Sequence, residues 1–127
     1  MLYVVNYHYI RKNYHPEKKG IIGIKPEHFI QQLKTLSQIG YIIRPRELTS
    51  NIIASDKKYI LITFDDGLRE QYENALPILD SLKYEAMFFV NTSGIKFGIV
   101  QNVHKIHLIR DSITDVELLN YIKSRLY

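Results

Sequence analysis

The sequence predicts an α/β fold built on a mainly parallel sheet. A run of β-forming residues over 59–64 is followed by a polar, acidic stretch, an apolar segment with helical periodicity over 76–83 and a second β-rich run over 86–90. This order of strand, loop, helix and strand is typical of a βαβ unit, whose two strands lie parallel. A strand over 2–9 and a helix over 26–39 precede it and extend the same pattern.

The first helix has clear start and stop signals. Pro26 suits the first turn of a helix, where its missing N–H removes no hydrogen bond, and Gly40 is a common helix terminator. The residues between them repeat at helical spacing, which predicts a buried stripe made of Phe29, Ile30, Leu33, Leu36 and Ile39. A basic loop over 11–24, which contains His15 and Pro16, connects the first strand to this helix.

Shorter elements follow this helix. Residues 41–43 predict a brief strand. It is stopped by Arg44 and Pro45, because proline fixes its own backbone and restricts the residue before it. A helical turn is expected within 46–54. Pro77 is expected in the first turn of the helix that joins the two strands of the βαβ unit.

The C-terminal part reads as a loop followed by helices. The stretch 91–94, Asn-Thr-Ser-Gly, predicts a loop after the second strand of the βαβ unit. Thr114 and Glu117 have the spacing of a capping box, which predicts the start of a final helix. The apolar stripe of that helix consists of Leu119, Ile122 and Leu126. Because exposed apolar stripes tend to bind other chains, we expect self-association, with a homo-oligomer as one outcome.

The most informative residues are two adjacent acids, Asp65 and Asp66, which follow the strand 59–64 and precede Gly67. The carboxyl ends of parallel strands are where functional residues gather. Two carboxylates held this close are costly to ionise together unless a cation lies between them or one stays protonated. The pair therefore indicates metal or acid–base chemistry. Asp-Asp-Gly is also ordinary turn chemistry, and this alternative stays open.

The five residues Thr63 to Gly67 resemble the first motif of the polysaccharide deacetylases, the NodB-homology group also called carbohydrate esterase family 4. The run Phe88-Phe89-Val90 is similar to the strand that follows this motif in the family, and the resemblance is best over 59–94. It implies a partial (β/α) barrel of the polysaccharide deacetylase type with a helical C-terminal portion. Residues 1–127 would then be a single domain that corresponds to the N-terminal part of a truncated deacetylase domain.

The resemblance also implies roles for individual residues. Asp65 takes the place of the catalytic base, and Asp66 that of a ligand to zinc or a similar divalent metal, with an N-acetylated glycan as the substrate. The Tyr-His pair that ends in His8 resembles a pair near the start of many members, which would place His8 on the same rim as Asp65. Thr92 and Ser93, in the expected second rim loop, are candidate substrate-contacting residues.

The family completes its metal site with a His-x-x-x-His motif that this sequence lacks. The nearest pair, His104 and His107, is spaced by three residues, which still shares a helix face and is compatible with metal binding. These histidines also flank an apolar stripe, which favours surface or capping roles for them. His15, followed by Pro16, mimics the end of the motif but falls in the basic loop. We therefore expect a weakly held metal and a chain that is weakly active or inactive alone.

Two other functions remain open. One is a non-catalytic truncated module that self-associates or pairs with a missing half. The other is a phosphotransferase of the haloacid-dehalogenase type, but those enzymes use the order Asp-x-Asp-Gly, whereas here the acids are adjacent and Phe64 occupies the first acid's position.

The composition limits which binding partners and which cellular compartment we expect. The 127 residues include no cysteine, which excludes disulfides and zinc–cysteine sites. The net charge of +4 comes from small basic clusters separated by acids, so we expect no nucleic-acid partner. We find neither a run of about 20 apolar residues nor the features of a signal peptide, which predicts no membrane span and a cytoplasmic location.

Overall fold

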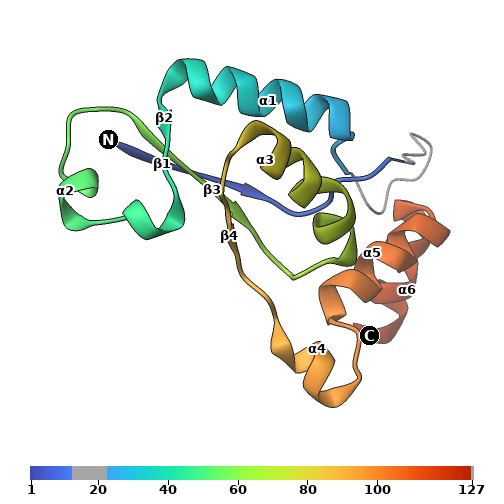
Figure 1. Ribbon diagram of the computed structural model, residues 1–127. Helices are drawn as coiled ribbons and strands as arrows, with labels where there is room; N and C mark the ends of the chain where they lie inside the picture. The colour runs from blue at the N-terminus through green and yellow to red at the C-terminus, as the bar shows by residue number, and fades with distance from the viewer. Residues whose placement is uncertain (13–22, 127) are drawn as a thin grey trace. The chain divides into compact units, whose positions relative to one another are not determined.

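The computed structural model describes residues 1–12 and 23–126 (Figure 1). The described residues up to Asn91 form one compact unit, and those from Thr92 onward form a second. Most of the basic loop expected over 11–24, including His15 and Pro16, lies outside the described residues.

The first unit is built on a parallel sheet whose central strand is β3 (Tyr59–Phe64). β1 (Leu2–Tyr7) pairs with β3 along its whole length, while β2 (Tyr41–Ile42) pairs with its beginning and β4 (Met87–Phe88) with its end. Every one of these pairings is parallel. The predicted α/β class and the predicted bounds of the central strand are therefore confirmed.

Helix α1 (Pro26–Ile39) begins and ends where the sequence predicts. Its side chains Phe29 and Leu33 are fully buried, but Ile39, expected in the buried stripe, is 48% exposed. Ile39 is the last helical residue, where the chain turns toward β2, so the sheet no longer covers it. The prediction of a continuous buried stripe is wrong at this end.

Gly40 ends α1 for a different reason than expected. Its φ of −166° is extended backbone, not the left-handed conformation typical of a glycine cap. A Cβ at this position would lie 2.6 Å from the backbone oxygen of Lys58. The glycine is therefore required because two backbone segments approach closely here, and Tyr41 donates its N–H to the same oxygen at 3.0 Å.

One hydrophobic cluster holds the first unit together. Its aromatic centre is formed by three rings: Phe29 packs edge-on against Tyr7 with centroids 4.9 Å apart and against Phe64 at 5.9 Å. Phe88 of β4 stacks on Phe64 at 4.8 Å. The buried members of the cluster are Tyr7, Ile10, Phe29, Leu33, Ile42, Ile60, Ile62, Phe64, Ala75 and Leu79.

The connection from β3 to β4 is helical over more of its length than expected. A π-helical segment, Gln71–Ala75, leads directly into α3 (Leu76–Leu82), so the predicted acidic loop is wrong for these residues. Leu76 donates its N–H to the oxygen of Gln71, five residues back, which is the spacing of a π-helix. The next residue, Pro77, has no N–H to donate.

β4 is shorter than the predicted strand over 86–90. Its ladder ends with the N–H of Phe89, which donates to the oxygen of Phe64 at 2.7 Å, and Phe89 and Val90 are 54% and 52% exposed. The helical turn expected within 46–54 is confirmed by a short 3-10 turn, Pro45–Glu47, and by α2 (Ser50–Ile53).

The second unit contains three helices: α4 (Thr92–Phe97), α5 (Asn102–Ser112) and α6 (Asp115–Leu126). The loop predicted over 91–94 is wrong, because Thr92 already begins α4. Asn, Ser and Thr favour helix starts as well as turns, so their composition cannot separate the two.

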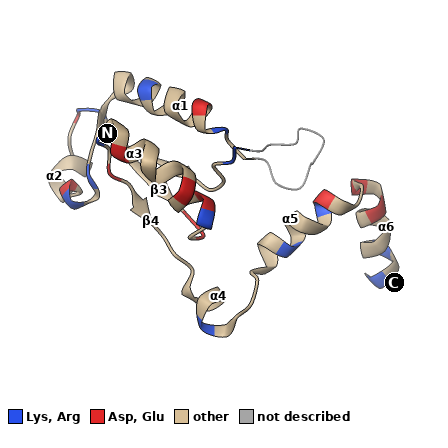
Figure 2. Cartoon of the chain, turned by 45° about the vertical axis from the view of Figure 1, so that its right-hand side comes forward, with Lys and Arg blue, Asp and Glu red and all other residues tan. Residues whose placement is uncertain are grey.

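The predicted capping box of α6 is confirmed. The N–H of Thr114 donates to Oε2 of Glu117 at 2.7 Å, and the N–H of Glu117 donates to Oγ1 of Thr114 at 3.2 Å. Figure 2 shows acids near the start of α6 and bases toward its end, a distribution that suits the helix dipole. None of the described helices has both the length and the apolarity needed to cross a bilayer.

Candidate functional site

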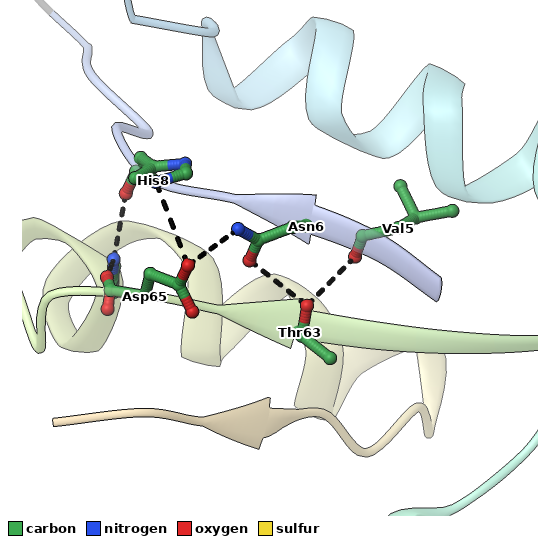
Figure 3. Close-up of polar contacts among 6 residues, drawn as sticks. Val5, Asn6, His8, Thr63 and Asp65 are labelled. Atoms are coloured by element: carbon green, nitrogen blue, oxygen red, sulfur yellow. Dashed lines mark hydrogen bonds and ion pairs between the residues drawn. The ribbon is translucent and has the colours of Figure 1, made fainter. Parts of the chain in front are cut away.

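The candidate site lies at the carboxyl ends of β1 and β3. Because Tyr7 pairs with Phe64 in parallel register, the residues that follow them, His8 and Asp65, lie at the same edge of the sheet. His8 Nε2 is 3.9 Å from Asp65 Oδ2 (Figure 3). The structure therefore brings together the two residues that the sequence placed on one rim.

The chain turns sharply directly after Asp65. Asp66 and Gly67 both have positive φ, 75° and 64°. Asp is among the few residues with side chains that visit this region often, whereas Gly67 is additionally required because a Cβ there would lie 2.7 Å from Val90 Cγ1. This turn joins a strand to a helical segment, and all pairings of β3 are parallel, so a hairpin turn is excluded.

The side chain of Asp65 is held by a residue that we did not single out from the sequence. Asn6 Nδ2 donates to Asp65 Oδ2 at 2.8 Å, and Asn6 Oδ1 accepts a hydrogen bond from Thr63 Oγ1 at 3.0 Å (Figure 3). A signal was available: Asn6 is polar within an apolar strand and lies two residues before His8, so strand alternation puts both on one face.

Gln71 fixes the backbone of the site. Its amide Nε2 donates both to the backbone oxygen of Asp65 at 2.6 Å and to that of His8 at 2.9 Å. The side chain is almost fully buried, at 2% exposure, and its Oε1 has no partner among the described residues. One glutamine thus ties the two strand ends together. The sequence offered no signal for it, since it falls in a stretch read as a polar loop.

Charged groups beside the acids form a second network. Arg11 donates from Nε to Glu70 Oε2 at 2.8 Å, and its guanidinium lies 4.7 Å from the ring centre of Tyr9. Burial raises the pKa of Glu70 despite this ion pair, and burial followed by the nearby Asp66 charge raises the pKa of Tyr9. Asp66 therefore contributes negative potential next to a half-buried ion pair.

The other candidate residues lie in the second unit. Thr92 is the first residue of α4, and Ser93 Oγ accepts a hydrogen bond from Gln101 Nε2 at 2.7 Å. His104 and His107 lie on α5 with ring centres 6.4 Å apart, which confirms their expected common face. Their roles in substrate or metal binding stay predictions.

The number of ligands that a catalytic metal needs can be compared with the side chains that the described residues offer. A catalytic zinc usually has three protein ligands. Within residues 1–12 and 23–126, no group of three histidines, cysteines or acids is placed to hold a metal ion. The described residues alone therefore do not fit a complete metal centre. What they do provide is a carboxylate fixed at the sheet edge, next to a histidine and a second acid.

Residues 53–112 match the family model described as polysaccharide deacetylase. The chain is 30% identical over 109 residues to the Bacillus subtilis (strain 168) protein named "Putative polysaccharide deacetylase YxkH", a match that covers 81% of this chain and 36% of that protein.

Solved structures agree with this assignment. IcaB from Ammonifex degensii matches with 31% identity and a TM-score of 0.56, over 70% of this chain and 37% of that one. The Streptococcus pyogenes deacetylase PplD, at 24% identity, shares the fold with a TM-score of 0.57 over 81% of this chain and 51% of that one. The expected partial (β/α) barrel is confirmed by these matches. The chain thus spans roughly a third to a half of the proteins that it matches, and its matched part, residues 53–112, belongs to the polysaccharide deacetylase family.

Proposed function

We propose that this chain supplies the acid-bearing edge of a polysaccharide deacetylase site, which hydrolyses the N-acetyl bond of amino sugars. The observation that supports the proposal best is the Asp65 carboxylate at the carboxyl end of β3, fixed by Asn6 and facing His8, within a motif that resembles the first motif of the family. The family membership favours this chemistry over the phosphotransferase alternative.

In this proposal Asp65 is the general base. Its carboxylate takes a proton from a water molecule, the water oxygen bonds to the acetyl carbonyl carbon, and the C–N bond then breaks to release acetate. The leaving nitrogen takes up a proton, so that a free amine is formed. General acid–base groups of this kind contribute about 10²- to 10⁴-fold to a rate.

Asp66 is proposed as one ligand of a divalent cation such as zinc. Since the described residues do not complete a ligand set, we expect weak binding by the chain alone. Calorimetry with zinc or cobalt tests this: wild type should bind weakly, and Asp66→Asn should abolish the heat. Tight binding that survives this substitution would place the site elsewhere, with His104 and His107 tested next.

Acetate release from N-acetylated glucosamine oligomers tests the role of Asp65. Asp65→Asn keeps the size of the side chain but removes the base, so release should fall about 100-fold or more. Asp80→Asn, an exposed acid on α3, is the matched control and should retain the wild-type rate. Acetate release by the wild type that stays equal in Asp65→Asn would refute the assignment of the base.

A second function, a non-catalytic module that associates with itself, is supported by the second unit. Its large apolar side chains remain exposed, among them Leu119 at 51% and Ile122 at 45%. Light scattering at rising concentration should then give masses above the 15.0 kDa monomer. Ile122→Lys should restore the monomer mass, and a wild-type chain that stays monomeric at high concentration would exclude this function.

A further inference from the structure

We infer that Asn6 is a positioning residue for the carboxylate of Asp65, a role that rests on the proposed function of Asp65 as the base. Asn6 lies on β1, directly across from Thr63 in the parallel register, so its side chain is adjacent to the end of β3. Its amide Nδ2 is 2.8 Å from Asp65 Oδ2, the same oxygen that lies 3.9 Å from His8 Nε2. In the proposed reaction the other oxygen, Oδ1, is the atom that takes the proton of the water.

The orientation of the Asn6 amide follows from its two neighbours. An ionised carboxylate only accepts hydrogen bonds, so the NH₂ group must face Asp65 and the amide oxygen must face away. On that side the hydroxyl of Thr63 lies 3.0 Å from Asn6 Oδ1 and donates to it. Thr63 is itself buried, at 3% exposure, and its hydroxyl lies closer to Asn6 Oδ1 than to its other acceptor, the backbone oxygen of Val5 at 3.5 Å (Figure 3). Thr63, Asn6 and Asp65 therefore form a chain of hydrogen bonds with a single direction.

This chain complements the clamp on the backbone of Asp65. The N–H of Asp65 donates to the oxygen of Tyr7 at 3.2 Å, and its oxygen accepts from Gln71 at 2.6 Å. Backbone contacts of this kind fix the Cα but leave the side-chain torsions free. The Asn6 amide, together with the longer contact to His8, restrains the plane of the carboxylate, and the activity of a base depends on that orientation.

The first test observes the side-chain amide of Asn6 by ¹⁵N NMR. In the wild-type chain its two protons should resonate well apart, and Asp65→Ala should shift them toward free-amide values. The side chain of Asn74, which donates to the backbone oxygen of Ile10 at 2.8 Å, is an internal control that should not move. Unchanged Asn6 signals in Asp65→Ala would overturn the inference, whatever the activity of the chain.

Two substitutions at Thr63 separate positioning from packing. Thr63→Ser keeps the hydroxyl, and Thr63→Val keeps the β-branched shape that suits a buried strand. The inference predicts that Ser preserves the Asn6 signals and Val moves them toward those of Asp65→Ala, although Val is the better strand former. The reverse ranking would show a packing role only and overturn the inference.

Kinetics distinguish this inference from the proposed function on which it rests. Asn6→Ala should lower kcat for acetate release about tenfold, since a hydrogen bond to a charged group is lost, and leave KM unchanged. If Asp65→Asn does not reduce the rate but Asp65→Ala still shifts the Asn6 amide signals, the role of Asp65 as the base is refuted and its contact with Asn6 is not. A normal kcat for Asn6→Ala, with Asp65→Asn inactive, would refute the positioning role alone.

Discussion

The two units of this chain use similar sequence patterns with opposite outcomes. Helix α1 of the first unit buries Phe29 and Leu33 completely, whereas α6 of the second leaves Leu119 and Ile122 about half exposed. All buried side chains among the described residues belong to the first unit. Periodic apolar residues therefore predict that a helix forms, but they do not predict that its apolar face is covered.

The difference comes from the sheet. The first unit has four parallel strands, and the apolar side chains of α1 and α3 pack against this sheet. The second unit has no strand among its described residues. Its helices depend on local signals such as the capping box at Thr114, and local signals contribute less than packing does.

The largest expected effect comes from the same substitution made in both units. Leu33→Ala should lower the free energy of unfolding of the first unit by about 2–5 kcal/mol, because it leaves a cavity in a closed core. Leu119→Ala should change the free energy of unfolding by less than about 0.5 kcal/mol, since the side chain is 51% exposed. Urea unfolding followed by amide signals from each unit measures both. Similar losses for the two variants would mean that α6 is covered in solution.

A second pair compares two glycines with positive φ. Gly67→Ala should cost about 2–3 kcal/mol, because the left-handed backbone is strained and the new Cβ would lie 2.7 Å from Val90. Gly98→Ala, also at positive φ but with nothing within 4 Å of its Cβ, should cost only about 1 kcal/mol. Urea titrations of each variant, read from the amide signals of its own unit, provide the comparison.

A double substitution sharpens this result. Val90→Ala removes the Cγ atoms that crowd Gly67, so Gly67→Ala should be less costly in that background than in the wild type. If the two effects simply add, the cost at Gly67 comes from its backbone conformation alone.

The sequence predicted elements better than contacts. The bounds of α1 and β3 were correct because proline, glycine and a run of β-formers mark them locally. Asn6 could have been singled out as a polar residue within an apolar strand, but its partner Asp65 lies 59 residues away in the sequence. Gln71 carried no such signal, because its contact with His8 spans 63 residues and it lies in a π-helical turn. The exposure of Ile39 likewise depends on where the sheet ends.

The smallest expected effect is a pair of pH dependences of opposite sign. Burial raises the pKa of Glu70 in the first unit, so the folded state binds a proton more tightly than the unfolded chain does. The stability of the first unit should therefore rise as the pH falls from that raised pKa toward about 4.5. Hydrogen bonds from the backbone and the hydroxyl of Thr114 lower the pKa of Glu117. The stability that Glu117 gives to α6 is therefore present above pH 4.5 and is lost as the pH falls through the lowered pKa.

Amide exchange measured against pH for each unit detects both trends. Glu70→Gln and Glu117→Gln should flatten the respective curves, because each keeps an acceptor oxygen but no longer titrates. Two curves with the same slope in the wild type would show that one of these carboxylates is not held as the structure describes.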